Sequence, residues 1–213
     1  MHEGYEPGTA LLVVDVQNDF ADPGGSLAVA DGAAILPLLN AAIAASRAGG
    51  AFVAYTQDWH PPATPHFAKD GGTWPVHCVA GTWGAELHPG LVAGAGPCVR
   101  KGAGGEDGYS GFAMGDPVTG TTVPTELDAL LRANGARRVV VGGLATDYCV
   151  MATVLDALKL GYETLVLVDA VRPVDQAPGD GEKALAEMER AGACLVRGPA
   201  ALPATAPPSH ARS

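Results

Sequence analysis

The sequence has few of the cysteines that stabilise small secreted proteins. Only four occur in 213 residues, Cys78, Cys98, Cys149 and Cys194, and no two of them form a CxxC pair. This scattered arrangement argues against a disulfide framework and leaves at least one thiol as a candidate for reaction. The first eight residues hold two acidic residues and no basic segment before the first apolar run, unlike a secretory signal. We therefore expect a cytoplasmic protein.

Positive charge and long hydrophobic runs are also scarce. The chain has 13 Lys and Arg against 23 Asp and Glu, a formal net charge of −10 that would repel a phosphate backbone. No group of basic residues interleaved with aromatics offsets that repulsion locally. The longest apolar runs, such as residues 10–14 and 139–141, are far shorter than the roughly 20 residues of a membrane span. We expect neither nucleic acid nor a membrane as a partner.

What the sequence does contain is a regular alternation of two kinds of segment. Short apolar, β-branched runs alternate with longer Ala- and Leu-rich segments of helical period, which is typical of βαβ units. The pattern predicts strands at residues 9–15, 51–57, 98–100, 138–141, 163–169 and 194–196, and helices at residues 33–48, 126–134, 147–159 and 181–191. The predicted fold is α/β, a three-layer α/β/α sandwich with a mostly parallel, Rossmann-like six-stranded sheet. We predict one domain at residues 1–197 and a disordered Pro/Ala-rich tail at residues 198–213.

Reactive side chains follow several of the predicted strands. Asp15, Asp58, Lys101 and the turn at residues 144–149 all lie at the carboxyl ends of strands, where ligands bind in open parallel sheets. This placement would gather a carboxylate, an ammonium and the Cys149 thiol in one crevice. A nearby ammonium lowers the pKa of a thiol from its usual value of about 8.5, and a carboxylate can accept its proton. A helix N-terminus would favour the thiolate further.

The segment around Cys149 carries a family resemblance. Residues 142–150, Gly-Gly-Leu-Ala-Thr-Asp-Tyr-Cys-Val, resemble the G-x-x-T-x-x-C-V signature of the isochorismatase-like cysteine hydrolases. Residues 14–20 are similar to that family's D-x-Q-N-D-F motif, and Lys101 with Gly102 follows a short strand as the family's lysine does. The resemblance extends over residues 9–196. It implies that Asp15 is the general base, Lys101 the electrostatic partner and Cys149 the nucleophile.

The same resemblance implies a particular backbone geometry before the nucleophile. It predicts a cis peptide between Leu144 and Ala145, a conformation that costs about 3 to 4 kcal/mol for a non-proline bond. The backbone N–H groups of Ala145 and Cys149 would then form the oxyanion hole. Losing one such donor typically lowers the rate by about 10² to 10³.

A long segment rich in Pro, Gly, Trp and His, at residues 58–97, has little periodicity and is of the kind usually kept for function. Asp58 and His60 are two residues apart on an extended stretch, so their side chains share one face. His66 and His77 follow in the same segment. One carboxylate with two or three imidazoles suits Zn²⁺, Fe²⁺ or Mn²⁺ and leaves positions open for water or substrate.

This metal pattern resembles the nicotinamidase/pyrazinamidase branch of the family. The resemblance implies Asp58, His60 and His77 as ligands, with His66 as a fourth that binds directly or through water. Zinc is the expected metal, with iron and manganese as alternatives, and no organic cofactor is expected. The metal would hold the pyridine nitrogen, while Phe20 and Trp74 pack on the ring. The implied reaction is hydrolysis of nicotinamide to nicotinate and ammonia through a cysteine thioester, extending to pyrazinamide-like amides.

Two other functions stay open at this point. The chain could be another cysteine hydrolase of the same fold, acting on a carbamoyl or ureido amide or on an enol ether, or a metal or thiol sensor without turnover. Residues 109–112 could line a pocket or only close a loop. Cys78, Cys98 and Cys194 are predicted to be packing residues. The Gly-rich residues 102–111 fit neither the P-loop spacing nor the dinucleotide-binding spacing, so nucleotide binding is not expected there. A homo-oligomer is compatible with the sequence.

Overall fold

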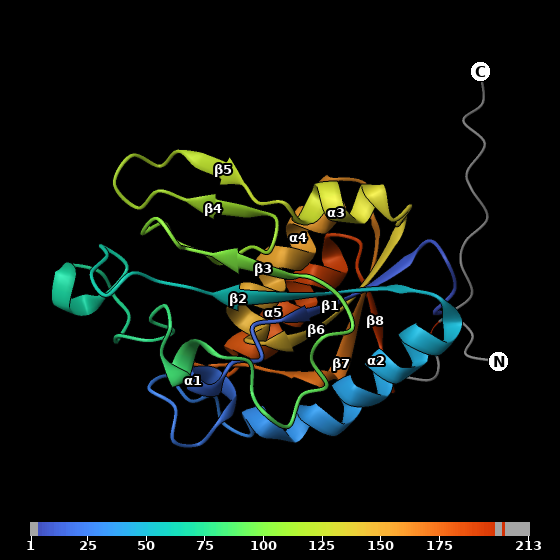
Figure 1. Ribbon diagram of the computed structural model, residues 1–213, viewed down its shortest axis with the longest axis horizontal. Coiled ribbons are helices and arrows are strands. Elements are labelled where there is room, and N and C mark those ends of the chain that lie inside the picture. Colours follow the sequence, from blue (N-terminus) through green and yellow to red (C-terminus); the bar gives the residue numbers. More distant parts are fainter. Residues whose placement is uncertain (1–3, 199–201, 203–213) are drawn as a thin grey trace.

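Six parallel strands form the central sheet of the protein, seen here in a computed structural model that describes residues 4–198 and 202 (Figure 1). In sheet order they are β3 (Cys98–Lys101), β2 (Phe52–Asp58), β1 (Thr9–Val14), β6 (Arg138–Leu144), β7 (Glu163–Arg172) and β8 (Cys194–Val196). Every pair of neighbours is parallel. The predicted six-stranded sheet is confirmed, whereas the predicted tail at residues 198–213 lies outside the described residues, except for Gly198 and Leu202.

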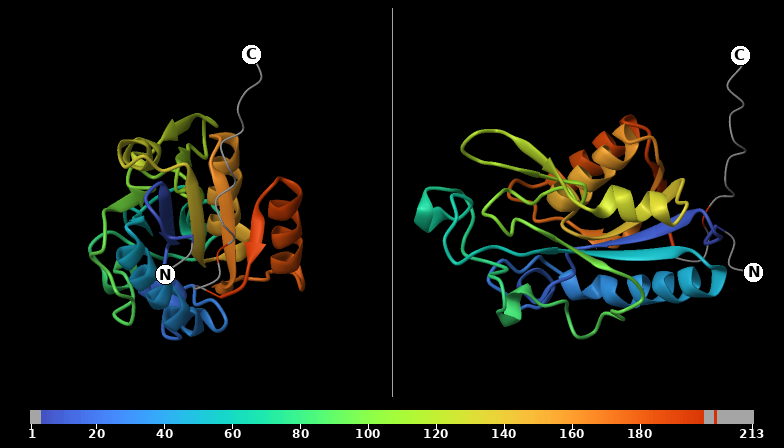
Figure 2. Two further views of the ribbon diagram at one scale, coloured as in Figure 1. Left: turned by 90° about the vertical axis from the view of Figure 1, so that its right-hand side faces the viewer. Right: turned by 45° about the horizontal axis from the view of Figure 1, so that its top comes forward.

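Helices cover both faces of this sheet (Figure 2). One face carries α2 (Leu36–Gly49), and the other carries α3 (Leu127–Ala133), α4 (Met151–Lys159) and α5 (Asp180–Arg190). The central strand β1 is buried at every residue, and its side chains alternate between the two layers. Leu11 packs in the cluster that includes Leu39 of α2, whereas Leu12 packs in the one that includes Val154 of α4. This arrangement confirms the predicted three-layer sandwich.

The helical stretch Gly32–Gly49, made of the 3₁₀ turn η1 (Gly32–Ile35) and α2, has a mean hydropathy of 1.2. Among the described residues it is the one helix long and apolar enough to cross a membrane by length and composition, although it contains no long unbroken apolar run. In the structure 44% of this stretch is buried inside the protein. Leu39 and Ile43 are fully buried against the sheet, so the helix serves as a core helix here.

Some short elements were not predicted. They are α1 (Asn18–Ala21), the antiparallel hairpin of β4 (Ala113–Gly115) and β5 (Thr122–Pro124), and the 3₁₀ turns η2 (Ala68–Asp70) and η3 (Trp83–Ala85). The structure also extends β6 to Leu144 and β7 to Arg172, each three residues beyond the predicted end. The strand extension carries β6 directly into the turn that holds Cys149.

Residues 59–88 of the irregular segment lie beyond the carboxyl ends of the strands, and residues 89–97 run back beside α2 and β2 to the start of β3. Figure 1 shows the first part of this segment at the left, beyond the ends of β2 and β3, and its last part returning below the sheet to the right-hand start of β3. Two short 3₁₀ turns are its only helical elements, as the lack of periodicity predicted. The segment therefore packs against the sheet edge where Asp15, Asp58 and Lys101 emerge.

Candidate active site

A buried ion pair lies at the ends of β1 and β3. Asp15 directly follows β1 with a φ of 48°, and neither its side chain nor that of Lys101 is exposed. Lys101 Nζ lies 2.7 Å from Asp15 Oδ2 and 2.9 Å from Asp58 Oδ1. It also donates to the backbone oxygens of Gly108 and, at 3.4 Å, Tyr109. The ammonium is thus held between two carboxylates in the protein interior.

Thr56 of β2 fixes the second oxygen of Asp15. Its hydroxyl donates to Asp15 Oδ1 at 2.6 Å and lies 3.2 Å from the Asp15 backbone N–H. Both carboxylate oxygens therefore have a partner, Lys101 on one and Thr56 on the other. Thr56 was not among the predicted site residues, because only the pairing of β1 with β2 brings this threonine beside Asp15.

The pKa values of Asp15, Asp58 and Lys101 are shifted in different directions. Burial raises the pKa of Asp15, and Lys101 offsets this only in part. Burial also tends to raise the pKa of Asp58. The positive charge of Lys101 and the neighbouring His60 and His77 outweigh this and hold that pKa well below the usual value. Burial lowers the pKa of Lys101, yet the two carboxylates raise it well above its usual value. Asp15 is therefore the carboxylate in this group that can most readily take up a proton.

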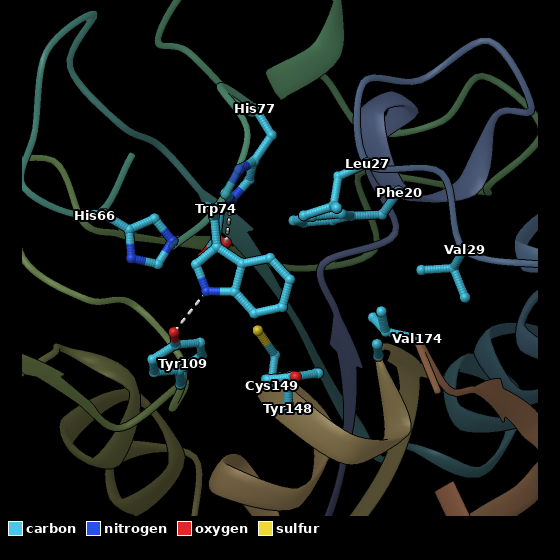
Figure 3. Close-up of a pocket in the computed structure, with 12 residues that line it drawn as sticks. Phe20, Leu27, Val29, His66, Trp74, His77, Tyr109, Tyr148, Cys149 and Val174 are labelled. Carbon is cyan, nitrogen blue, oxygen red and sulfur yellow. Dashed lines mark hydrogen bonds and ion pairs between the residues drawn. The ribbon is translucent and has the colours of Figure 1, made fainter. Parts of the chain in front are cut away.

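Cys149 projects into the pocket from the π-helical turn η4 (Thr146–Val150), which leads into α4 (Figure 3). Its carboxylate neighbours are close, since Sγ and an oxygen each of Asp15 and Asp58 lie within 4.8 Å of one another. Burial raises the pKa of the thiol well above its usual value, and Lys101 lowers it only partly. The expectation of a lowered thiol pKa was therefore wrong, because desolvation outweighs the ammonium. The resting thiol is protonated and needs a base before it can attack.

The turn before Cys149 has the predicted backbone form. The Leu144–Ala145 peptide is cis, which confirms that expectation. Asp147 accepts the backbone N–H groups of Val174 and Asp175, each at 2.9 Å, and so ties the turn to the chain that follows β7. Ala145 lines the same pocket as Cys149. Its role in an oxyanion hole stays a prediction.

Three histidines and a carboxylate form a second cluster beside the triad. One ring nitrogen from each of His60, His66 and His77 lies within 4.8 Å of the others. Asp58 Oδ2 is 3.7 Å from His60 Nε2 and 3.8 Å from His77 Nε2. All four residues are buried. The structure thus brings together the four residues predicted as metal ligands, including His66.

The polar atoms of this cluster fit a divalent metal ion. Neither ring nitrogen of His60 has a hydrogen-bond partner among the described residues, although the side chain is fully buried. A buried polar atom without a partner is costly, and a metal ion would satisfy the one that faces the cluster. Three imidazoles with one carboxylate are a donor set suited to Zn²⁺, Fe²⁺ or Mn²⁺.

Neighbouring groups hold several of these ligands in place. His77 Nδ1 lies 2.7 Å from the Pro75 oxygen, and His66 Nδ1 lies 2.5 Å from Asp107 Oδ1. The Gln17 side-chain amide makes two hydrogen bonds with the backbone of Asp58. Its Nε2 donates to the Asp58 oxygen at 2.7 Å, and its Oε1 accepts the Asp58 N–H at 2.8 Å. Gln17 and Asp107 were not among the predicted site residues. The motif at residues 14–20 was the available signal for Gln17, whereas Asp107 had none.

A single pocket of about 370 Å³, including the part open to solvent, joins the two clusters. Cys149 lies at one side, His66 and His77 at the other, and the predicted ring-binding residues Phe20 and Trp74 line the space between (Figure 3). Further lining residues that the sequence did not reveal are Leu27, Val29, Tyr148 and Val174. The walls are therefore largely apolar and aromatic, with a thiol and a group of imidazoles facing one space.

The alternatives left open for residues 109–112 divide between two roles. Tyr109 lines the pocket, and its hydroxyl accepts the Trp74 Nε1–H at 2.8 Å. Tyr148 contributes an edge-to-face contact to Trp74, with ring centroids 4.9 Å apart. Phe112 instead packs in the core beside α3 and α4. This segment thus supplies one pocket residue and one core residue.

The remaining cysteines take no part in the pocket. All four cysteines of the chain are free thiols. Cys78 is fully buried and Cys98 half-buried, as packing residues would be. Cys194 is exposed, so the packing prediction was wrong for it, because it opens the short edge strand β8 at the sheet border.

Known proteins are similar to this chain over most of its length. The isochorismatase domain model matches residues 9–198. The nicotinamidase of Escherichia coli (strain K12) is 41% identical over 206 residues, covering 89% of this chain and 94% of that protein.

Two solved structures are similar in both sequence and fold. One is pyrazinamidase of Pyrococcus horikoshii in complex with zinc, 42% identical with a TM-score of 0.79, covering 90% of this chain and 99% of that one. The other is PnC1 from L. infantum in complex with nicotinate, 38% identical with a TM-score of 0.82, covering 90% and 93% of the two chains. The likeness thus includes one structure with zinc bound and one with nicotinate bound.

Proposed function

Because the chain belongs to the isochorismatase family, we propose that it is a nicotinamidase, which hydrolyses nicotinamide to nicotinate and ammonia and also accepts pyrazinamide-like amides. One observation carries this proposal. A single pocket exposes the Cys149 thiol on one side and the imidazoles of His66 and His77 on the other, with Phe20 and Trp74 between them. A flat heteroaromatic amide presents a ring nitrogen at one end and a carbonyl carbon at the other, which matches this division.

The metal half would set the orientation of the substrate. Asp58, His60, His66 and His77 would hold a divalent ion, for which we propose zinc, and this ion would supply a Lewis-acid anchor for the ring nitrogen. Phe20 and Trp74 would pack on the faces of the ring and exclude water. The carboxamide would then point at Cys149.

The triad would perform the bond-making and bond-breaking steps. Asp15 takes the proton from Cys149 Sγ, which its raised pKa permits, and the thiolate attacks the amide carbon. The carbonyl oxygen becomes an oxyanion held by the N–H groups of Ala145 and Cys149. The proton on Asp15 passes to the amide nitrogen, the C–N bond breaks and ammonia leaves. Lys101 keeps its charge throughout and fixes the position of Asp15.

The resulting thioester is resolved by water. Asp15, again ionised, takes a proton from a water molecule, and the hydroxide formed attacks the thioester carbon. The C–S bond breaks, the acid is released and the proton returns to Cys149 Sγ. The cycle consumes one water for each amide and requires no organic cofactor.

Ammonia release from nicotinamide, measured together with the metal content of the same purified protein, tests this proposal. The wild type is expected to turn over with metal bound, and Cys149→Ala to lose turnover by about 10⁴-fold or more while it keeps the metal. Cys194→Ala is the matched control, because it removes an exposed thiol far from the pocket, and it should retain activity. Turnover of carbamoyl or ureido amides alone would support a different hydrolase of this fold. Bound metal without any turnover would support a sensor.

A further inference from the structure

Three consecutive residues, 107–109, contact every part of the site. Asp107 Oδ1 lies 2.5 Å from His66 Nδ1, in the metal cluster. The Gly108 backbone oxygen accepts from Lys101 Nζ, in the triad. The Tyr109 hydroxyl accepts from Trp74 Nε1, in the pocket wall. We call residues 107–109 the connecting segment, since its three residues contact the metal cluster, the triad and the pocket wall in turn.

The backbone of Asp107 is fixed independently of His66. Its N–H donates to the Gly115 oxygen at 2.7 Å, and the Gly115 N–H donates back to the Asp107 oxygen at 2.9 Å. This paired bridge anchors Asp107 to Gly115, the last residue of β4 in the β4–β5 hairpin. A second bond, from Thr64 Oγ1 to the Gly105 oxygen at 2.8 Å, joins the segment that carries His66 to the same loop. These bonds hold the Asp107 carboxylate in a fixed position beside the His66 imidazole.

His66 needs such a partner to act as a ligand. Its Nδ1 faces Asp107, and Figure 3 shows the other ring nitrogen turned toward the pocket and His77. A carboxylate on Nδ1 holds the proton at that nitrogen and leaves Nε2 as a lone-pair donor. At 2.5 Å, Asp107 Oδ1 is close enough to accept the Nδ1 proton directly. Without Asp107 the ring could rotate or take the other tautomer.

We propose that Asp107 is a positioning residue for the metal centre, which orients His66 and links metal binding, through residues 107–109, to the placement of Lys101 and Trp74. This inference rests on the metal site of the proposed function and adds to it a residue from outside the ligand set. Partners of this kind commonly contribute about 10- to 100-fold to metal affinity.

The test is a zinc affinity measurement on metal-free protein, by competition with a chromophoric chelator. Asp107→Ala is expected to bind zinc about 10- to 100-fold more weakly than the wild type. Asp107→Asn, which keeps an acceptor oxygen but loses the charge, should fall between the two. Glu106→Gln is the matched control, because it removes the same charge one residue away, where the side chain accepts the exposed Gly104 N–H. Its affinity should equal that of the wild type.

A second readout addresses the link itself. Zinc should slow amide hydrogen exchange in peptides covering residues 102–115 of the wild type, and this effect should be lost in Asp107→Ala. Equal zinc affinity in Asp107→Ala, Asp107→Asn and the control would overturn the inference, even if nicotinamide is hydrolysed. Weaker zinc binding in the variants of a protein that releases no ammonia would support the inference and reject the proposed function. If Asp107→Ala fails to fold, Asp107→Asn decides.

Discussion

The two halves of the site are built in different ways. Asp15 and Lys101 lie at or directly after the ends of parallel strands, and their side chains are fully buried in the sheet layer. His66 and His77 instead lie on the irregular residues 59–97, where short turns and single contacts replace a hydrogen-bonded ladder. The catalytic half is therefore preorganised by the fold, whereas the metal half depends on neighbouring groups and on the ion it holds. The first should tolerate loss of metal, and the second should not.

The largest effect is expected when the positive charge at the centre of the catalytic half is removed. Lys101→Met would leave Asp15 and Asp58 buried side by side without a cation. Breaking a buried pair in this way costs about 3 to 5 kcal/mol of unfolding free energy. Turnover should fall by about 10² or more, since the position and charge of Asp15 depend on Lys101. Urea unfolding and ammonia release measure the two effects.

Lys183→Met is the control for this change. Lys183 is exposed and pairs with Asp180 on the surface of α5, so its removal should leave both stability and turnover unchanged. If Lys101→Met behaved like Lys183→Met, the buried ion pair would not hold the catalytic half together.

Removal of the metal ion tests the metal half of the site. Dialysis against a strong chelator should lower nicotinamide turnover by about 10² or more, because the anchor of the substrate is lost. The circular dichroism spectrum should stay unchanged, since the sheet and its helices do not depend on the ligands. Added zinc should restore the rate. A metal-free protein that turns over at the full rate, or one that unfolds, would contradict the division between the halves.

The smallest expected effect concerns the pH dependence of the catalytic half. Asp15 must be ionised to take the thiol proton, and its pKa is raised above the usual 3.8, so kcat/KM should fall with decreasing pH at a midpoint above that value. Thr56→Val removes a hydrogen bond to the ionised form and should raise this midpoint by up to about 1 pH unit.

Thr164→Val is the matched control for that profile. Thr164 is equally buried, but its hydroxyl donates to the Tyr162 oxygen, away from the site. Its acid limb should coincide with that of the wild type. A shift of the Thr56→Val limb to lower pH would contradict the assignment of Asp15 as the base.

The same contrast explains what the sequence could predict. Strand periodicity located Asp15, Asp58 and Lys101 at strand ends, because an apolar run followed by a polar residue is a local pattern. The contacts of Thr56, Gln17 and Asp107 join residues 41 positions apart, so the sequence around each residue does not reveal its partner. The hairpin of β4 and β5 was missed because its strands have three residues each, too few for alternation to show.

The sign of the thiol pKa shift was wrong for a related reason. The sequence placed a cation near Cys149, but it did not show that the thiol would be 6% exposed. Desolvation depends on everything packed around a group, and only the assembled pocket reveals it. Charge partners could thus be predicted from strand ends, whereas burial could not.

The central claim is that the triad sets the reaction and the metal half sets the substrate. The ratio of kcat/KM for nicotinamide to that for benzamide, measured with the metal-loaded protein, tests this most directly, because benzamide has the same carboxamide and lacks only the ring nitrogen. A site built to bind that nitrogen should favour nicotinamide by about 10² or more. Equal values for the two amides would show that Asp58, His60, His66 and His77 do not select the substrate.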